Sequence, residues 1–238
     1  IMRVLLKNRA LLKISGKDSE EFIQNQFSND IEKLNHSSIQ INAYCQHQGK
    51  IIGLFWVMRY EDNFLLSFPI DLADVIKSRL QIFVIMSDVI IYDISASYSQ
   101  IGLIDEKHSN AYSINDSLSL IIDNTIDKFN SKIEENTKWT LACIKSSLPE
   151  VFLATSEKFV PQMLNLDIDE LGVSFLKGCY PGQEVVARLH YLGSAKRRLF
   201  SFQSDHEMQV GDSLYCATSK TALARGDRYK GSGIVVSK

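Results

Sequence analysis

The chain has 238 residues, of which 45% are hydrophobic and 23% charged, and its formal net charge is −2. This much apolar sequence is enough for a substantial core in one large domain or two smaller ones. A nearly neutral chain has no overall positive field to attract nucleic acid, so direct RNA binding is not expected. No stretch approaches the roughly 20 consecutive apolar residues of a membrane span. The first residues mix charges with apolar side chains and lack the cleavage pattern of a signal peptide, so we expect a cytoplasmic protein with no membrane partner.

In the first half of the chain, predicted strands and helices alternate. Residues 10–16 are typical of a strand that ends at a glycine. Asp18 and Glu21 have the spacing of a helix capping box. In the helix that follows, apolar residues recur at helical spacing, namely Ile23, Phe27, Ile31 and Leu34. Between residues 38 and 68 the period changes to two, which predicts three antiparallel strands with a turn at Gly49. A second amphipathic helix is then predicted to bury Leu72, Val75, Ile76 and Leu80.

The second half is predicted to contain further strands, one polar helix and a small β-unit. Strands are predicted at 89–94, 99–104 and 118–122, and again in the β-unit at 196–203, 212–218 and 231–238. A helix is predicted near residues 127–136, and residues 139–144 fit either another strand or the end of that helix. The pattern predicts an α+β fold of antiparallel sheets with helices on one face, which ends in a small barrel or sandwich fragment.

The stretch KGCYPGQEVVAR, residues 177–188, contains the one cysteine whose neighbours suggest chemistry. The four cysteines of the chain, Cys45, Cys143, Cys179 and Cys216, are scattered, which argues against a zinc site or a self-contained iron–sulfur site. We therefore expect no metal site. Disulfides are also not expected in a cytosolic chain.

Pro181 suits the first position of a helix, where its missing N–H costs nothing. Gly182, Gln183 and Glu184 would then present free backbone N–H groups at the positive end of that helix. Cys179 lies just outside this end and two residues after Lys177. Both features favour thiolate over thiol, so Cys179 is predicted to be the most reactive cysteine if it is exposed.

The residues alone also allow a purely structural interpretation. The segment from Gly178 to Gly182 can be a tight turn whose cysteine is a small buried hydrophobic residue. Glu184 and Arg188, four residues apart, can be an ordinary ion pair on a helix surface.

The pattern Lys-Gly-Cys-aromatic-x-Gly-Gln-Glu, with an arginine four residues after the glutamate, resembles the signature of the YgfZ-type folate-binding proteins. These form the tRNA-modification and iron–sulfur-maintenance branch of the glycine-cleavage T-protein (aminomethyltransferase) superfamily. Every specified position is met, by Lys177, Gly178, Cys179, Tyr180, Gly182, Gln183, Glu184 and Arg188. The segments LLKISGKDSEEFIQNQFSND, YCQHQGKIIGLF, FVPQMLNLD and LGSAKRRLF are similar to other parts of the family pattern, so that the resemblance covers most of the chain except about residues 95–135.

The resemblance implies a ring of antiparallel-sheet subdomains around a cavity for tetrahydrofolate or a derivative. It also implies a folate-binding region of two interleaved lobes in residues 1–193 and a small, truncated β-barrel in residues 194–238. It also implies a role in assembling or repairing iron–sulfur enzymes, including those that thiolate tRNA, which would then be the partners. By position Cys179 is the signature cysteine and the implied reacting residue. The implied folate-binding residues are Trp139, Gln183, Glu184 and Arg188. An indole at Trp139 can stack on a flat pterin or aminobenzoyl ring, although a tryptophan at a helix–sheet junction is equally well a core residue.

Three positions depart from the superfamily pattern. Aminomethyltransferases carry an acidic pair where this chain has Gly53 and Leu54, which argues against aminomethyl transfer by the usual route. A glutamate that pairs with pterin N–H groups is replaced by Lys145, which offers only donors. Arg9 replaces an aromatic residue near the N-terminal strand. Folate binding is therefore expected to be weak, altered or lost unless Glu184 faces the cavity.

Three functions remain open from the sequence. The first is a folate-linked accessory protein that uses Cys179, and the second is a folate-dependent one-carbon transferase. The third is a structural or RNA-binding adaptor, for which a small basic-aromatic patch is the candidate surface, formed by Tyr191, Lys196, Arg197, Arg198 and Phe200. A solvated strand end explains the same patch. Of the five histidines, only His47 and His190 are expected near the cavity, and none has metal-ligand spacing.

Overall fold

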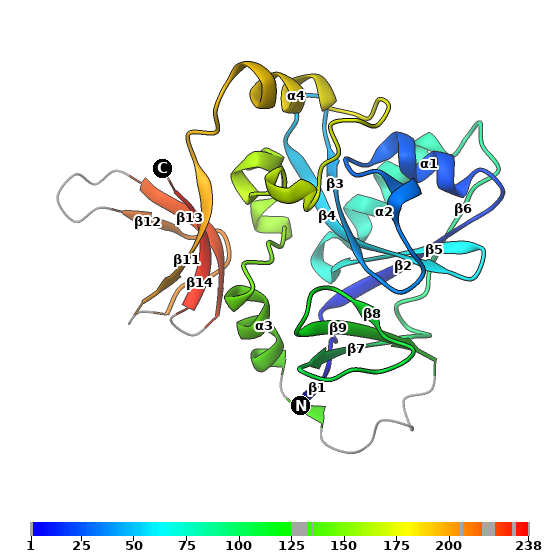
Figure 1. Ribbon diagram of the computed structural model, residues 1–238, viewed down its shortest axis with the longest axis horizontal. Coiled ribbons are helices and arrows are strands. Elements are labelled where there is room, and N and C mark those ends of the chain that lie inside the picture. The colour runs from blue at the N-terminus through cyan, green and yellow to red at the C-terminus, as the bar shows by residue number, and fades with distance from the viewer. Residues whose placement is uncertain are drawn as a thin grey trace.

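The computed structural model describes residues 2–124, 133–134, 136–204, 207–215, 222–229 and 232–237. Of residues 133–134, 214–215, 222–229 and 232–237 only the backbone is described. Three sheets, two of five strands and one of four, are combined with four α-helices and short 3-10 turns in the described ranges (Figure 1). Mixed sheets and helices confirm the predicted α+β class.

The central sheet has the strand order β3-β4-β5-β2-β6 and is antiparallel throughout. Its strands are β2 (Arg9–Ser15), β3 (Gln40–Cys45), β4 (Ile51–Tyr60), β5 (Asn63–Pro69) and β6 (Ile90–Asp93). The predicted three-stranded meander is therefore confirmed. Eight of the ten residues of β4 are buried, because this strand lies inside the sheet and is covered on both faces.

Two helices bury their apolar faces next to this sheet, α1 (Ser19–Gln26) and α2 (Ala73–Phe83), which follows the 3-10 turn η2 (Ile70–Leu72). The predicted helix after residue 18 is shorter than expected, because the chain leaves α1 at Phe27 and Ile31 belongs to a separate 3-10 turn, η1 (Ile31–Lys33). The predicted capping box is wrong. Asp18 caps no N–H of α1, and its Oδ2 instead accepts the backbone N–H of Asp88 at 2.7 Å.

A second five-stranded sheet has the order β10-β1-β7-β9-β8. Its strands are β1 (Met2–Leu5), β7 (Ser99–Ile104), β8 (Tyr112–Ser113), β9 (Leu118–Asp123) and β10 (Ile133–Glu134). The predicted strands at 99–104 and 118–122 are confirmed. Of the described strands of this sheet, only β1 and β10 pair in parallel.

The sequence allowed either a strand or the end of a helix at residues 139–144. These residues are helical and belong to α3 (Asn136–Lys145). Most of the helix predicted near 127–136 falls on residues outside the described ranges. α3 contacts β1 and β7 on one side and the C-terminal sheet on the other, so it joins the two sheets (Figure 1).

Between α3 and the cysteine motif the chain makes three 3-10 turns, η4 (Leu153–Thr155), η5 (Pro161–Leu164) and η6 (Ile168–Glu170). Helix α4 (Gln183–Leu192) begins within the cysteine motif and lies at the top of the molecule in Figure 1.

The C-terminal strands are β11 (Arg198–Gln203), β12 (Ser213–Tyr215), β13 (Ala222–Tyr229) and β14 (Ser232–Ser237), in the order β11-β14-β13-β12. The sequence did not predict β13. No pairing between β11 and β12 occurs in the described ranges, so closure into the predicted barrel stays a prediction, as does the domain boundary after residue 193. None of the helices described is long and apolar enough to cross a membrane.

Candidate functional site

The loop before α4 presents Cys179 to solvent. Cys179 is exposed, whereas Cys45 and Cys143 are buried. Cys216 lies outside the described residues. Burial raises the pKa of the Cys45 thiol to about 12, which keeps that sulfur protonated and inert. The condition set for the reactivity of Cys179, its exposure, is thus met, and the alternative in which it fills the core is excluded.

Lys177 anchors the start of the motif to α1. Its Nζ donates to the backbone carbonyl oxygen of Phe27 at 2.5 Å and to that of Gln24. These carbonyls end α1, where a cation interacts favourably with the helix dipole. Burial lowers the pKa of Lys177 to about 8, and Asp30 opposes this shift. The sequence analysis used Lys177 to favour the thiolate of Cys179. In the structure the ammonium of Lys177 instead donates to backbone carbonyls at the end of α1.

Tyr180 and Gln183 fix the two ends of the exposed loop. Tyr180 is buried, its ring centroid lies 5.2 Å from Nζ of Lys177, and burial raises the pKa of its hydroxyl. Nε2 of Gln183 donates to the carbonyl oxygens of Lys177 at 3.5 Å and Gly178 at 3.3 Å. The motif therefore holds its own loop closed while its sulfur stays outside.

Helix α4 begins two residues later than the sequence predicted. Gly182, not Pro181, is adjacent to the first helical residue, and Gly182 has a left-handed backbone with φ +82°. The N–H of Gln183 is also not free, because it donates to the carbonyl oxygen of Tyr180 at 3.2 Å. Pro181 instead lines a neighbouring cavity.

The two remaining charged residues of the motif form a surface pair. Nη2 of Arg188 donates to Oε1 of Glu184 at 2.6 Å, and both side chains are mostly exposed. Exposed pairs of this kind contribute little to stability. Glu184 therefore does not face a cavity as an acceptor.

Trp139 lines a small cavity beside β4 and α3. The cavity has a volume of about 40 Å³, and its wall consists of Asn8, Arg9, Trp56, Trp139, Thr140, Cys143, Ile144, Leu148, Glu150 and Phe152. Trp139 is 4% exposed and packs edge-on against Trp56, with 6.1 Å between ring centroids. It also lies flat on β7, where a Cβ on Gly102 would come within 2.4 Å of its ring. Trp139 is thus both a core residue and a cavity wall.

A buried ion pair closes this cavity. Nη1 of Arg9 lies 2.5 Å from Oε2 of Glu150, and the guanidinium carbon lies 3.7 Å from the ring centroid of Trp56. Nε of Arg9 donates to Oγ of Ser67 at 2.8 Å, and Ser67 in turn donates to Oε1 of Gln100 at 2.5 Å. The sequence analysis missed Trp56 and Glu150. Trp56 is hidden in the apolar run of β4, and the only local signal for Glu150 is one acidic residue between Pro149 and Val151.

One relative identifies the family, and two others are similar to most of the chain. A protein from Colwellia psychrerythraea named tRNA-modifying protein YgfZ is 30% identical over 242 residues, which cover 84% of this chain and 74% of that protein. The chain belongs to the YgfZ family. The YgfZ protein of Aliivibrio fischeri is 25% identical over 98% of this chain and 79% of its own length, and an uncharacterized protein of Haemophilus influenzae is 29% identical over 89% and 77%. No family model matches the chain.

The fold is that of the aminomethyltransferases. The crystal structure of glycine cleavage system aminomethyltransferase T from Bartonella henselae superposes with a TM-score of 0.70 at 10% identity, and the match covers 99% of this YgfZ-family chain and 77% of that one. The T-protein-like fold predicted from the motif is thereby confirmed.

The structure explains why this YgfZ-family chain has no acidic pair at Gly53 and Leu54. A Cβ on Gly53 would lie 2.9 Å from Cδ1 of Ile76, and Leu54 is fully buried. Both positions of β4 are filled by core packing, so a carboxylate there would be buried without a partner. Lys145 is exposed at the end of α3 and lies outside the cavity wall, and Glu150 supplies the buried carboxylate instead.

The four predicted folate residues do not line a common cavity among the three described. Trp139 lines the 40 Å³ cavity, whereas Gln183, Glu184 and Arg188 belong to α4 and line none of the three. Cys179 lines none of these three either. A common folate site for these residues therefore stays a prediction.

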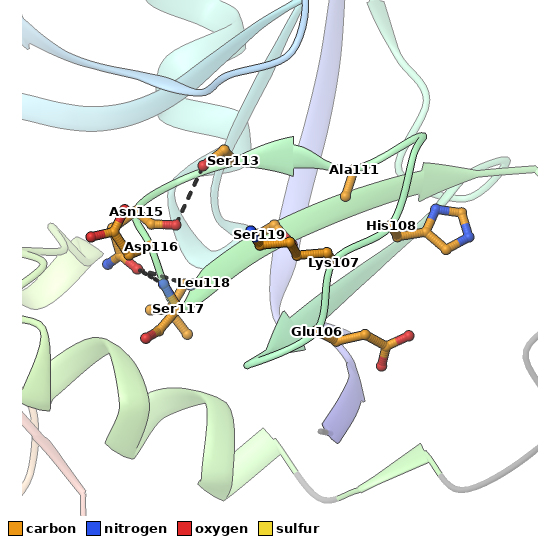
Figure 2. Close-up of a pocket in the computed structure, with 10 residues that line it drawn as sticks. All are labelled: Glu106, Lys107, His108, Ala111, Ser113, Asn115, Asp116, Ser117, Leu118 and Ser119. Atoms are coloured by element: carbon orange, nitrogen blue, oxygen red, sulfur yellow. Dashed lines mark hydrogen bonds between the residues drawn. The ribbon is translucent and has the colours of Figure 1, made fainter.

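Two other cavities lie elsewhere. One of about 180 Å³ is lined by His47 and Pro181 and by exposed apolar residues of α2. Another, of about 500 Å³, lies at the edge of the sheet that contains β8 and β9 (Figure 2). There Oδ1 of Asn115 accepts the N–H groups of Ser117 and Leu118, so this amide oxygen is used by its own turn. Among the described residues no cluster of three or more potential metal ligands occurs.

The basic-aromatic patch is partly structural. Arg198 pairs with Asp167, with Nη1 and Oδ1 2.5 Å apart, and donates to the carbonyl oxygen of Gln162 at 2.9 Å, so it ties β11 to η5. Tyr191 and Phe200 remain exposed. His190 stacks on Phe175 at 3.7 Å and lines none of the three cavities.

Proposed function

We propose that this YgfZ-family chain is a folate-linked accessory protein of the cytoplasm, which supports the assembly or repair of iron–sulfur enzymes through Cys179. The relatives are named tRNA-modifying proteins, and we propose that the enzymes served here include those that thiolate tRNA. The partners would be a reduced folate and the client enzyme, with no direct contact to RNA.

The observation that carries this proposal is that most residues between Lys177 and Gln183 stabilise the loop, while the thiol of Cys179 faces solvent. Lys177, Tyr180, Gly182 and Gln183 each have a structural contact that holds the loop, whereas the side chain of Cys179 is exposed. A conserved fold does not require an exposed thiol for packing. One thiolate can provide one ligand to an iron–sulfur centre, so the other ligands would come from the client enzyme.

A complementation experiment tests the role of Cys179. In a strain that lacks its own YgfZ-type protein, Cys179→Ala is expected to abolish support of an iron–sulfur tRNA-thiolating enzyme, measured as thiolated nucleoside in bulk tRNA. Because Cys179 is exposed, the variant is expected to keep the unfolding midpoint of the natural protein. Glu184→Ala, which removes an exposed group of the same motif, is the matched control. Full rescue by Cys179→Ala would contradict the proposal.

The Trp139 cavity fits a folate in chemistry but not in size. Its two indoles can stack on a pterin, and Glu150 is a buried acceptor. However, 40 Å³ is far below the ~300–1,000 Å³ of typical ligand sites. We therefore derive no reaction step through a folate and expect weak binding.

Calorimetric titration with tetrahydrofolate tests this part of the proposal. We expect measurable heat with the natural protein and no change with Lys145→Glu, because Lys145 is exposed and outside the cavity wall. Trp139→Ala is expected to weaken binding at least tenfold. Absence of heat and of any thermal shift in the natural protein would remove the folate from the proposed function.

A further inference from the structure

We propose that the cavity of about 180 Å³ between the end of α2 and the loop that carries Cys179 is an anchor pocket for a partner protein, which inserts one large apolar side chain from an acidic segment. The partner is the client enzyme of the proposed function, and the inference rests on that function for the identity of the partner. It adds the surface that holds the client beside Cys179.

Three segments that are distant in sequence form the walls of this anchor pocket. The hairpin between β3 and β4 supplies His47 and Ile52, the last turn of α2 supplies Ile82 and Phe83, and the cysteine loop supplies Pro181. Apolar side chains therefore come from both the central sheet and α2, and the cysteine loop closes one side.

The anchor pocket adjoins the exposed thiol. Pro181 follows Cys179 by two residues, and two residues of chain span at most about 7 Å. The hairpin wall is also held against the start of α4, because a Cβ on Gly182 would lie 2.9 Å from Cα of Gly49. A side chain held in the anchor pocket would therefore keep the protein that carries it next to Cys179.

Exposed apolar side chains continue from the pocket past the end of α2. Ile82 and Phe83 are 63% and 47% exposed, and Ile85 and Met86, just after the helix, are 80% and 96% exposed. Within residues 82–86 only Val84 is buried. Single exposed apolar residues are common on proteins, but several of them next to a cavity are typical of a surface that binds another protein.

The volume of the pocket fits a side chain better than a cofactor. About 180 Å³ is below the ~300–1,000 Å³ of typical small-molecule sites. Protein interfaces, in contrast, obtain much of their binding energy from a few bulky side chains that fill pockets. Because Ile52, Ile82 and Phe83 contribute apolar walls, the inserted side chain is expected to be a large aliphatic or aromatic one.

The charges at the pocket indicate what surrounds this side chain in the partner. Arg79 and His47 line the pocket, and none of its described lining residues carries a carboxylate. Burial raises the pKa of the Tyr44 hydroxyl and the charge of Arg79 opposes this shift, so the field of Arg79 reaches the pocket wall. Glu157 lies 3.3 Å from Arg79, but both side chains are partly exposed, so this pair leaves Arg79 able to attract a second carboxylate. A partner segment with carboxylates beside its apolar side chain complements these groups.

The test measures binding of a purified iron–sulfur enzyme that thiolates tRNA, from the strain used for complementation, to the natural protein and its variants by calorimetry. Ile82→Asp is expected to weaken binding at least tenfold, because it places a carboxylate in an apolar wall of the pocket. Ile70→Asp is the matched control and is expected to bind within twofold of the natural protein. Ile70 is also an exposed isoleucine, but it lies in η2 at the opposite end of α2.

Two substitutions of His47 test the charge of the partner segment. His47→Glu adds a negative charge to the pocket and is expected to weaken binding at least threefold in about 0.1 M salt and less in about 1 M salt, where charges are screened. His47→Gln adds no charge and is expected to bind within twofold of the natural protein. Equal affinity of the two variants at the lower salt concentration would overturn the inference, because the segment would not be acidic.

All four variants change exposed residues, so circular dichroism is expected to show the natural fold in each. Absence of binding by the natural protein, or binding by Ile82→Asp within twofold of it, would overturn the inference. Light scattering measures whether a second copy of the chain covers the pocket instead. A natural dimer that Ile82→Asp converts to a monomer would also overturn the inference.

Cys179→Ala separates this inference from the proposed function. This variant is expected to bind the enzyme like the natural protein although it does not support thiolation. If Cys179→Ala rescues fully while Ile82→Asp loses binding, the role of Cys179 is lost and the anchor pocket stands. If Cys179→Ala is inactive while Ile82→Asp binds normally, the role of Cys179 stands and the anchor pocket is lost.

Discussion

Gly49 and Gly182 lie directly against one another, so that the hairpin between β3 and β4 supports the start of α4. A Cβ on Gly182 would lie 2.9 Å from Cα of Gly49 and 2.5 Å from the carbonyl oxygen of Gln46. Both glycines have a positive φ, +77° and +82°. Two segments of the chain 133 residues apart therefore meet where no side chain is tolerated (182 − 49 = 133). This contact sets the position of the cysteine loop relative to the central sheet.

Gly182→Ala is expected to destabilise the protein strongly. The left-handed backbone costs about 1–2 kcal/mol for a residue with a Cβ, and the clash with the hairpin adds about 1–3 kcal/mol. The free energy of unfolding from urea denaturation measures the sum.

Gly178→Ala is the matched control in the same loop. A Cβ on Gly178 would meet no atom within 4 Å, so the change is expected to be within about 0.5 kcal/mol of the natural protein. Equal losses for the two variants would show that the hairpin contact does not restrict Gly182.

The cysteines are expected to differ sharply in reactivity. In the native protein iodoacetamide should modify Cys179 within minutes, while Cys45 and Cys143 should react only after unfolding, because both are buried and burial raises the pKa of Cys45 to about 12. Peptide mapping by mass spectrometry measures each site. Labelling of Cys45 at the rate of Cys179 would contradict the structure, and Cys179→Ser provides the blank for the exposed site.

Lys177 is expected to make stability depend on pH. Burial lowers its pKa to about 8 in the folded protein from an ordinary value of 10.5. Between these pH values the unfolded chain binds more protons than the folded one, so the Lys177 contribution to the free energy of unfolding rises with pH, and its penalty is full below pH 8.

The measurement is the difference in unfolding free energy between the natural protein and Lys177→Met at several pH values. This difference should move in favour of the natural protein from about pH 8 to pH 10. Other groups titrate in both proteins and cancel. A difference that stays constant over this range would show that the ammonium keeps an ordinary pKa.

Gly53 is expected to resist any side chain. In Gly53→Ala the new methyl group meets Cδ1 of Ile76 at 2.9 Å and the ring of Phe55 at 3.2 Å, which should cost about 1–3 kcal/mol. Ile76→Val removes Cδ1, so the double variant should be more stable than the sum of the two single losses. Additive losses in thermal or urea unfolding would show that Ile76 does not restrict this position. Gly53→Asp should lose more than Gly53→Ala and gain no aminomethyl-transfer activity.

The sequence predicted helices and strands correctly where the period of the apolar residues matches the face that is buried in the structure. The alternation from Ile39 to Cys45 and the continuous apolar run from Ile51 gave the meander, because strands with a buried face have a fixed side-chain period. The error at Asp18 arose from a contact distant in sequence, because Asp18 has the right spacing for a cap but accepts the N–H of Asp88 instead. The error at Gln183 is local, because its N–H donates to the carbonyl oxygen of Tyr180 and is not free for a ligand.

The sequence by itself determined the family motif, the α+β class and the cysteine to examine, because motif residues and periodicity are local properties of the chain. Only the tertiary structure decided that Cys179 is exposed while Lys177 and Tyr180 are buried, and that Trp139 lines a cavity beside β4 and α3. It also decided that Glu150, rather than the residue at position 145, faces Arg9. The physical reason is that burial and pairing depend on which distant segments pack together, and the spacing of residues along the chain does not contain that information.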